Sequence, residues 1–96
     1  MALDPILKAK RAAILSIANR HGAGNVRVFG SAARGESGPD SDVDFLVDVG
    51  DVHSSWFPAG LVLDLEELLG RKVDVLTEGA VYAPLRERIF AEAVPL

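Results

Sequence analysis

The chain of 96 residues has no cysteine, and this excludes disulfide bonds, zinc sites built from thiolates and a thiol nucleophile. It also lacks any apolar run near the ~20 residues of a membrane span. Lys8, Lys10 and Arg11 interrupt the N-terminal stretch, which therefore has no signal-peptide apolar core. We expect a cytoplasmic location and no membrane contact.

Positive charge is missing from a long central stretch, because no Lys or Arg occurs between Arg34 and Arg71. A surface that binds nucleic acid shows the opposite bias, so no direct nucleic-acid binding is expected. The acidic middle favours metal binding or a basic protein partner instead. The length predicts a single domain over residues 1–96, and the apolar fraction of 49%, ordinary for a globular protein, indicates that it is folded.

A Gly-Ser pair followed by an Asp-x-Asp pair is the most informative pattern in the chain. Gly30 and Ser31 follow a largely apolar run, and ten residues separate Ser31 from Asp42. Asp44 leads into a second apolar run. The pattern predicts a strand, a turn of small residues and a second strand that carries two carboxylates at its start.

The two carboxylates of the second strand should point to the same face. Side chains alternate along a strand, so Asp42 and Asp44 lie roughly 6–7 Å apart, while Val43, Phe45 and Val47 face a core. At an effective dielectric near 20 their repulsion is on the order of 2–3 kcal/mol. A divalent cation would relieve it, and hard oxygen ligands suit Mg²⁺ or Mn²⁺. The alternative is a pair of solvated charges at a strand edge.

The turn offers groups that suit a phosphate. Gly30 allows close approach of the backbone, and Ser31 supplies a hydroxyl and an N–H. If residues 32–34 form a first helical turn, their N–H groups face an anion, and Arg34 adds a permanent positive charge. The alternative is an ordinary loop, and the pattern is not a Walker A loop because it has no Gly-Lys-Ser/Thr.

These residues resemble a known family. The pattern Gly30-Ser31, Arg34-Gly35 and Ser41-Asp42-x-Asp44 is similar to the polymerase-beta-like nucleotidyltransferases, and more narrowly to the minimal nucleotidyltransferases paired with HEPN-domain partners. Residues 65–76 resemble the family's helix, glycine turn and third strand, and residues 85–96 its tail. The resemblance implies an α/β (α+β) fold with a small, mixed, three-stranded sheet and flanking helices.

The same resemblance implies a third carboxylate, for which Asp74 is the matching position. Asp74 stands between Val73 and Val75, where a charge is expensive unless it has a partner or a function. Asp48 is the rival, but it lies about 13 Å from Asp42 along the strand, too far to share a metal ion. Pairing of Asp74 with a neighbouring Lys or Arg at an exposed edge is the other interpretation.

The activity that the resemblance implies is Mg²⁺-dependent transfer of AMP from ATP to a hydroxyl. Asp42, Asp44 and Asp74 would be catalytic and hold the metal, and Gly30, Ser31 and Arg34 would bind the phosphates. The acceptor would be a tyrosine of a HEPN RNase toxin, so that the chain acts as an antitoxin within a hetero-oligomer. Two alternatives stay open: an antitoxin that neutralises by binding alone, and a small-molecule nucleotidyltransferase acting as a homodimer.

The rest of the sequence predicts scaffold helices. One should begin at Asp4-Pro5 and end at His21-Gly22. A second should run from about Pro58 to Leu69, capped by Ser55 and stopped by Gly70. Pro84 should open a last helix with Leu85, Ile89 and Ala93 on one side. The sequence leaves open the acceptor, the base, the number of nucleotides added, the oligomeric state and the roles of Trp56, Phe57 and Tyr82.

Overall fold

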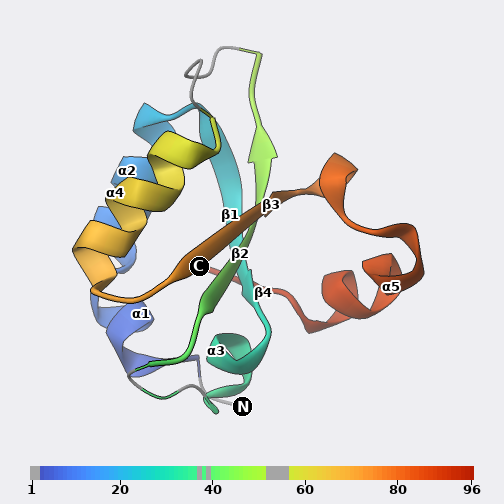
Figure 1. Cartoon of the computed structure of the whole chain (residues 1–96), viewed down its shortest axis with the longest axis horizontal. Coiled ribbons are helices and arrows are strands. Elements are labelled where there is room, and N and C mark those ends of the chain that lie inside the picture. Colours follow the sequence, from blue (N-terminus) through green and yellow to red (C-terminus); the bar gives the residue numbers. More distant parts are fainter. Residues whose placement is uncertain (1–2, 37, 39, 52–56) are drawn as a thin grey trace.

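The computed structural model describes residues 3–36, 38, 40–51 and 57–96. The elements in chain order are α1 (Pro5–Ala9), α2 (Arg11–Arg20), β1 (Ala23–Phe29), α3 (Ser31–Arg34), β2 (Val43–Val49), α4 (Ala59–Leu69), β3 (Val73–Thr77), the 3₁₀ helix η1 (Glu78–Ala80), α5 (Ala83–Glu92) and β4 (Val94–Pro95). In Figure 1 the helices α1, α2 and α4 cover one side of the sheet, and α5 lies on the opposite side. The expected α+β architecture is confirmed.

The sheet is mixed, with the strand order β3-β2-β1-β4. β1 runs antiparallel to both β2 and β4, and β2 runs parallel to β3. The parallel pairing sets Asp44 opposite Asp74, so the topology brings two of the predicted site residues onto adjacent strands. The crossover between β2 and β3 contains α4, as parallel neighbours require.

The sheet has four strands and not the expected three, because β4 adds a short strand at its edge. The last helix ends at Glu92, and Ala93 is already extended, so the chain turns back to form β4 against β1. The Leu96 N–H donates to the Val26 carbonyl at 2.9 Å. Pro95 is tolerated there because β4 is an edge strand.

The core lies between the sheet and the helices α1, α2 and α4. The prediction that Val43, Phe45 and Val47 face a core is confirmed, since all three are buried, and Leu46 on the opposite face of β2 is buried as well. The first three belong to one cluster with Leu7 from α1, Ile14, Ile17 and Ala18 from α2, and Leu61, Leu65 and Leu69 from α4. Burying one such side chain stabilises the fold by roughly 1.5–3 kcal/mol, so this face anchors β2 firmly.

The first helix is divided, contrary to the prediction of a single one. Asp4 caps α1 by accepting the Ile6 N–H at 2.9 Å, and Pro5 follows at the first position, as expected. The backbone at Lys10 then leaves helical geometry and α2 begins at Arg11. The Lys10 ammonium donates to the Leu68 carbonyl at 2.9 Å, which ties this junction to α4.

The second predicted helix is α4, which begins one residue after Pro58 and ends at Gly70 as expected. Gly70 adopts a left-handed conformation and donates to the Glu66 carbonyl at 2.8 Å. The proposed cap Ser55 and the aromatic Trp56 lie outside the described residues. Phe57 is half-buried and packs against the core. Within the described residues, no helix is long and apolar enough to cross a membrane.

Candidate functional site

Gly30 brings the backbone into contact with a carboxylate. It ends β1 with a φ of 74°, which favours glycine. A Cβ at this position would lie 2.5 Å from Oδ2 of Asp44. The sequence pattern therefore has a steric reason, because only a residue without a side chain fits beside Asp44 here.

The turn after Gly30 forms the short helix α3, as predicted, and Gly35 ends it in a left-handed conformation. The expectation that the N–H groups of residues 32–34 are free is wrong for two of them. Ala33 and Arg34 donate to the Gly30 carbonyl at 3.1 and 3.3 Å. Ser31 and Ala32 are the residues whose N–H groups can serve an anion.

Asp44 is the carboxylate at the centre of the site. It is half-buried, whereas Asp42 and Asp74 are exposed. Burial raises the pKa of Asp44, and the negative charges of Asp74 and then Asp42 raise it further. Three carboxylates from β3 and the start of β2 therefore act on one another, although Asp44 and Asp74 lie 30 positions apart in the chain.

The carboxylates are neighbours, but their side chains do not converge. Among the described residues, no group of three or more His, Cys, Asp and Glu side chains is gathered closely enough to hold a metal ion. The hard oxygen donors, the raised pKa of Asp44 and the space kept by Gly30 all fit a divalent cation.

Asp48 has a different environment, although it lies on the same strand. Its carboxylate pairs with the Arg27 guanidinium at 2.9 Å and accepts from the Asn25 amide at 3.1 Å. Arg27 also pairs with Glu78 at 2.6 Å. The charge of Asp48 is thus balanced within the chain, whereas the environment of Asp44 raises its pKa.

The Arg34 side chain is already paired with carboxylates, although a residue predicted to bind phosphate would be expected to have its charge available. Its guanidinium pairs with Glu36 at 2.8 Å and also with Glu92 from the end of α5. A triphosphate that used Arg34 would have to displace one of these carboxylates. Sequence reasoning missed Glu92 because it lies 58 residues away, with no local pattern to reveal the contact.

A buried ion pair next to the site was also missed. Arg71, only 5% exposed, pairs with Asp4, 7% exposed, at 2.9 Å. The Arg71 guanidinium also donates to the Ser41 carbonyl at 3.1 Å, and the Val43 N–H donates to the Lys72 carbonyl at 2.9 Å. These bonds fix the entry into β2 on both sides of Asp42. In the sequence, Asp4 was interpreted only as a helix cap.

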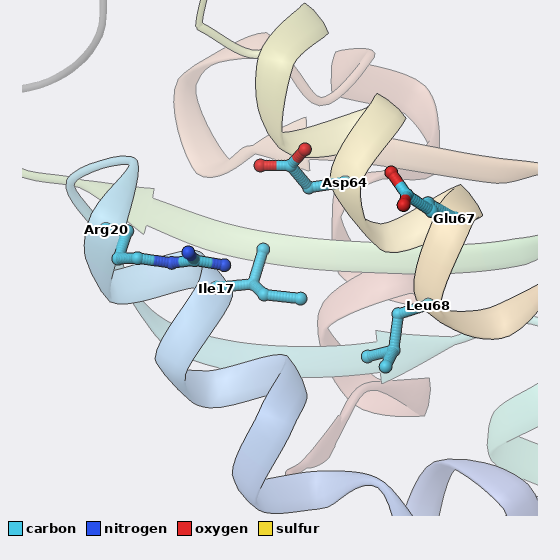
Figure 2. A pocket seen from close by; sticks show the side chains of 5 residues that line it. All are labelled: Ile17, Arg20, Asp64, Glu67 and Leu68. Carbon is cyan, nitrogen blue, oxygen red and sulfur yellow. The ribbon is translucent and has the colours of Figure 1, made fainter.

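Two hollows in the described surface lie away from the carboxylates. One, of about 440 Å³, lies between α2 and α4, where Ile17, Arg20, Asp64, Glu67 and Leu68 line it (Figure 2). The other, of about 500 Å³, lies near the turn after α2 and the end of β2. At the candidate site itself, Asp42 and Asp74 are exposed and Asp44 is half-buried, so solvent and a large substrate can reach these carboxylates.

The comparisons with known proteins agree with the fold and the motif. The model of the nucleotidyltransferase domain family matches residues 11–96. A protein of Methanocaldococcus jannaschii that is assigned as a protein adenylyltransferase is 42% identical over 81 residues, which cover 84% of this chain and 87% of the relative. The protein adenylyltransferase MntA of Thermococcus cleftensis is 37% identical over 75 residues, covering 78% and 76%.

Solved structures show the same architecture. One assigned as a minimal nucleotidyltransferase has 47% identity and a TM-score of 0.84, covering 98% of this chain and 97% of that one. A toxin–antitoxin structure with AMP-PNP has 20% identity and a TM-score of 0.71, covering 92% and 70%, and shares the fold. The chain belongs to the nucleotidyltransferase domain family and, within it, is an enzyme of the minimal nucleotidyltransferase type, similar to the protein adenylyltransferases.

Proposed function

We propose that the chain transfers AMP from ATP to a tyrosine hydroxyl of a HEPN-domain toxin and acts as the antitoxin of that toxin. The observation that carries the proposal is the pairing of Asp44 with Asp74 across parallel strands, beside the backbone turn at Gly30. That arrangement sets an acidic pair next to a turn that can receive a phosphate, which is what nucleotidyl transfer requires.

The carboxylates of Asp42, Asp44 and Asp74 would hold Mg²⁺ or Mn²⁺. When bound, the ion neutralises the triphosphate and makes the acceptor hydroxyl easier to deprotonate. Asp74, the exposed residue of β3, would orient the incoming hydroxyl and accept its proton. The acceptor oxygen attacks the α-phosphorus, the bond to the bridging oxygen of the β-phosphate breaks, and pyrophosphate leaves.

The turn residues would hold the phosphates. Gly30 admits the nucleotide close to the backbone, and the Ser31 hydroxyl with the N–H groups of Ser31 and Ala32 can donate to the β- and γ-phosphate oxygens. Arg34 would contribute its charge after exchanging Glu36 for phosphate. Positioning and charge neutralisation would supply most of the rate, since phosphoryl chemistry needs little covalent help from the protein.

A protein acceptor is favoured over a small molecule for two reasons. The carboxylates of Asp42 and Asp74 are exposed, so a residue on the surface of another protein could reach them. The relatives named as protein adenylyltransferases, whose lengths this chain matches over 87% and 76%, support the same acceptor class.

The test separates catalysis from neutralisation by binding. The purified chain, ATP, Mg²⁺ and the product of the neighbouring gene, tested as the proposed HEPN partner, are mixed, and the intact mass of that protein is measured. We expect one or more AMP additions with the wild-type chain. Asp42→Asn and Asp44→Asn should form the complex without adding AMP and should fail to silence the RNase. Unchanged silencing by both variants would instead establish neutralisation by occlusion.

A further inference from the structure

Helix α5 contributes almost nothing to the core. All ten of its residues are described, and none is buried, whereas α2 and α4 bury three residues each. Figure 1 shows α5 on the side of the sheet opposite to α2 and α4. Because none of its side chains is fully buried, α5 gains little stability from burial, so its exposed apolar side chains need another explanation.

Those side chains form one stripe. Tyr82, Leu85 and Phe90 are 69%, 45% and 36% exposed, and Ile89 is half-buried between them. Their spacing, together with that of Arg86, is that of one helix face. We call these five residues the α5 stripe. Exposed aromatic and apolar side chains that adjoin one another are typical of a protein interface, while isolated ones are ordinary.

The charged side chains of α5 indicate what kind of protein surface would bind the α5 stripe. The Arg86 guanidinium lies 5.4 Å from the centre of the Phe90 ring. Neither Arg86 nor Arg88 pairs with a carboxylate in the part of the chain that the structure describes, although Arg27, Arg34 and Arg71 all do. The unpaired cation of Arg86, within the stripe, fits an apolar surface that carries carboxylates, while Arg88 and Glu87 flank the stripe on its two sides and offset each other in charge.

A second copy of the chain fits poorly. Arg86 stands at the middle of the stripe, so a two-fold pairing of α5 with itself would place Arg86 against Arg86. Such a like-charge contact disfavours self-association. A different protein with acidic residues around an apolar helix avoids the clash.

The ends of α5 are attached to the elements of the candidate site. Its N-terminal end follows β3, which carries Asp74, through η1. At its C-terminal end Glu92 pairs with Arg34 of α3, the helix that follows Gly30. A protein bound along α5 would therefore lie next to the strand and the turn that carry the proposed chemistry.

We propose that the α5 stripe is the docking surface for the acceptor protein, which presents an apolar helix bordered by acidic residues. This inference rests on the proposed function for the identity of the acceptor. The surface supplies affinity and brings a hydroxyl toward Asp74, while Asp42 and Asp44 take no part in holding the protein.

The test measures binding and nucleotide affinity separately. Leu85→Glu and Phe90→Glu are compared with Leu63→Glu, a matched control on α4 whose side chain is 64% exposed on the other side of the sheet. The probe is the product of the neighbouring gene, the proposed HEPN partner, titrated by calorimetry, and Mg²⁺-ATP is titrated in parallel. We expect both α5 variants to bind the protein at least tenfold more weakly, with unchanged ATP affinity, and the control to bind like the wild type.

A charge-reversal variant provides a second, independent test of the docking surface. Arg86→Glu should weaken protein binding, and the loss should shrink as salt is raised, because screening removes the attraction that the variant lacks. Wild-type affinity of Leu85→Glu and Phe90→Glu would overturn the proposal, and so would an equal loss in Leu63→Glu. Light scattering that finds a wild-type dimer, dissociated by Leu85→Glu, would overturn it in favour of a second copy.

The two proposals fail in different ways. A wild-type chain that binds the HEPN protein through α5 but adds no AMP retains the docking surface and loses the proposed activity. A chain that adds AMP equally well with Leu85→Glu keeps the activity and loses the docking surface.

Discussion

Replacing Asp44 with Asn should make the metal-free protein more stable. The carboxylate of Asp44 is half-buried, and its pKa is raised by burial and by the charges of Asp74 and Asp42. A raised carboxyl pKa means that the native state holds the proton more tightly than the unfolded chain does. Ionised Asp44 therefore destabilises the fold at neutral pH.

The magnitude follows from the register of β2 and β3. Neighbouring strands lie about 4.8 Å apart, and two unit charges at about 5 Å repel by about 3 kcal/mol at a dielectric of 20 and by about 1 kcal/mol in water. Since Asp74 is exposed, the lower figure applies. A gain of about 1 kcal/mol raises the Tm of a domain of this size by roughly 4–8 °C.

The pH dependence has a definite sign. Below the ordinary pKa of 3.8 Asp44 is protonated in both states, so wild type and Asp44→Asn should then be equally stable. The advantage of the variant should grow as the pH rises through the raised native pKa and stay constant above it. Thermal and urea unfolding, followed by circular dichroism in EDTA at low salt, measures the difference.

Asp48→Asn is the matched control on the same strand. It removes one of the two carboxylate partners of Arg27, so it should leave stability unchanged or lower it by up to about 1 kcal/mol. A stability of Asp44→Asn at or below that of the wild type at pH 7 would refute the reasoning. An equal rise in both variants would also refute it, because a general loss of negative charge would then explain the gain.

Three further predictions concern the scaffold. Gly30→Ala places a methyl group against Asp44 at a left-handed φ, so it should lower the Tm and reduce AMP transfer. Asp4→Asn leaves Arg71 buried and unpaired and should cost about 3–5 kcal/mol in urea unfolding, and Asp4→Ala should cost about 1 kcal/mol more because the α1 cap is lost as well. Leu65→Ala should cost about 2–5 kcal/mol by the same assay without changing ATP affinity.

Local patterns in the sequence predicted the elements that surround the site. The alternation of Val43, Phe45 and Val47 gave the buried face of β2, and Gly70 gave the end of α4. Each of these patterns lies within a few residues of the element that it predicts. The preference for Asp74 over Asp48 as the third carboxylate came from strand geometry and the family resemblance. In the structure, Asp74 of β3 lies opposite Asp44 of β2.

Features that depend on distant contacts could not be predicted. β4 is two residues long and contains a proline, so no periodicity announces it, and it forms because β1 offers a free edge. The Asp4–Arg71 pair joins residues 67 apart, and Arg34 meets Glu92 only when α5 returns to the sheet. The sequence shows that these charges exist but not which of them meet.

The role of Asp74 is the central claim, and one measurement tests it most directly. The proposed HEPN partner is incubated with ATP, Mg²⁺ and either wild type, Asp74→Asn or Asp48→Asn, and its intact mass is recorded over time. We predict AMP addition by wild type and Asp48→Asn, and none by Asp74→Asn in spite of normal complex formation. AMP addition by Asp74→Asn at the wild-type rate would contradict the claim.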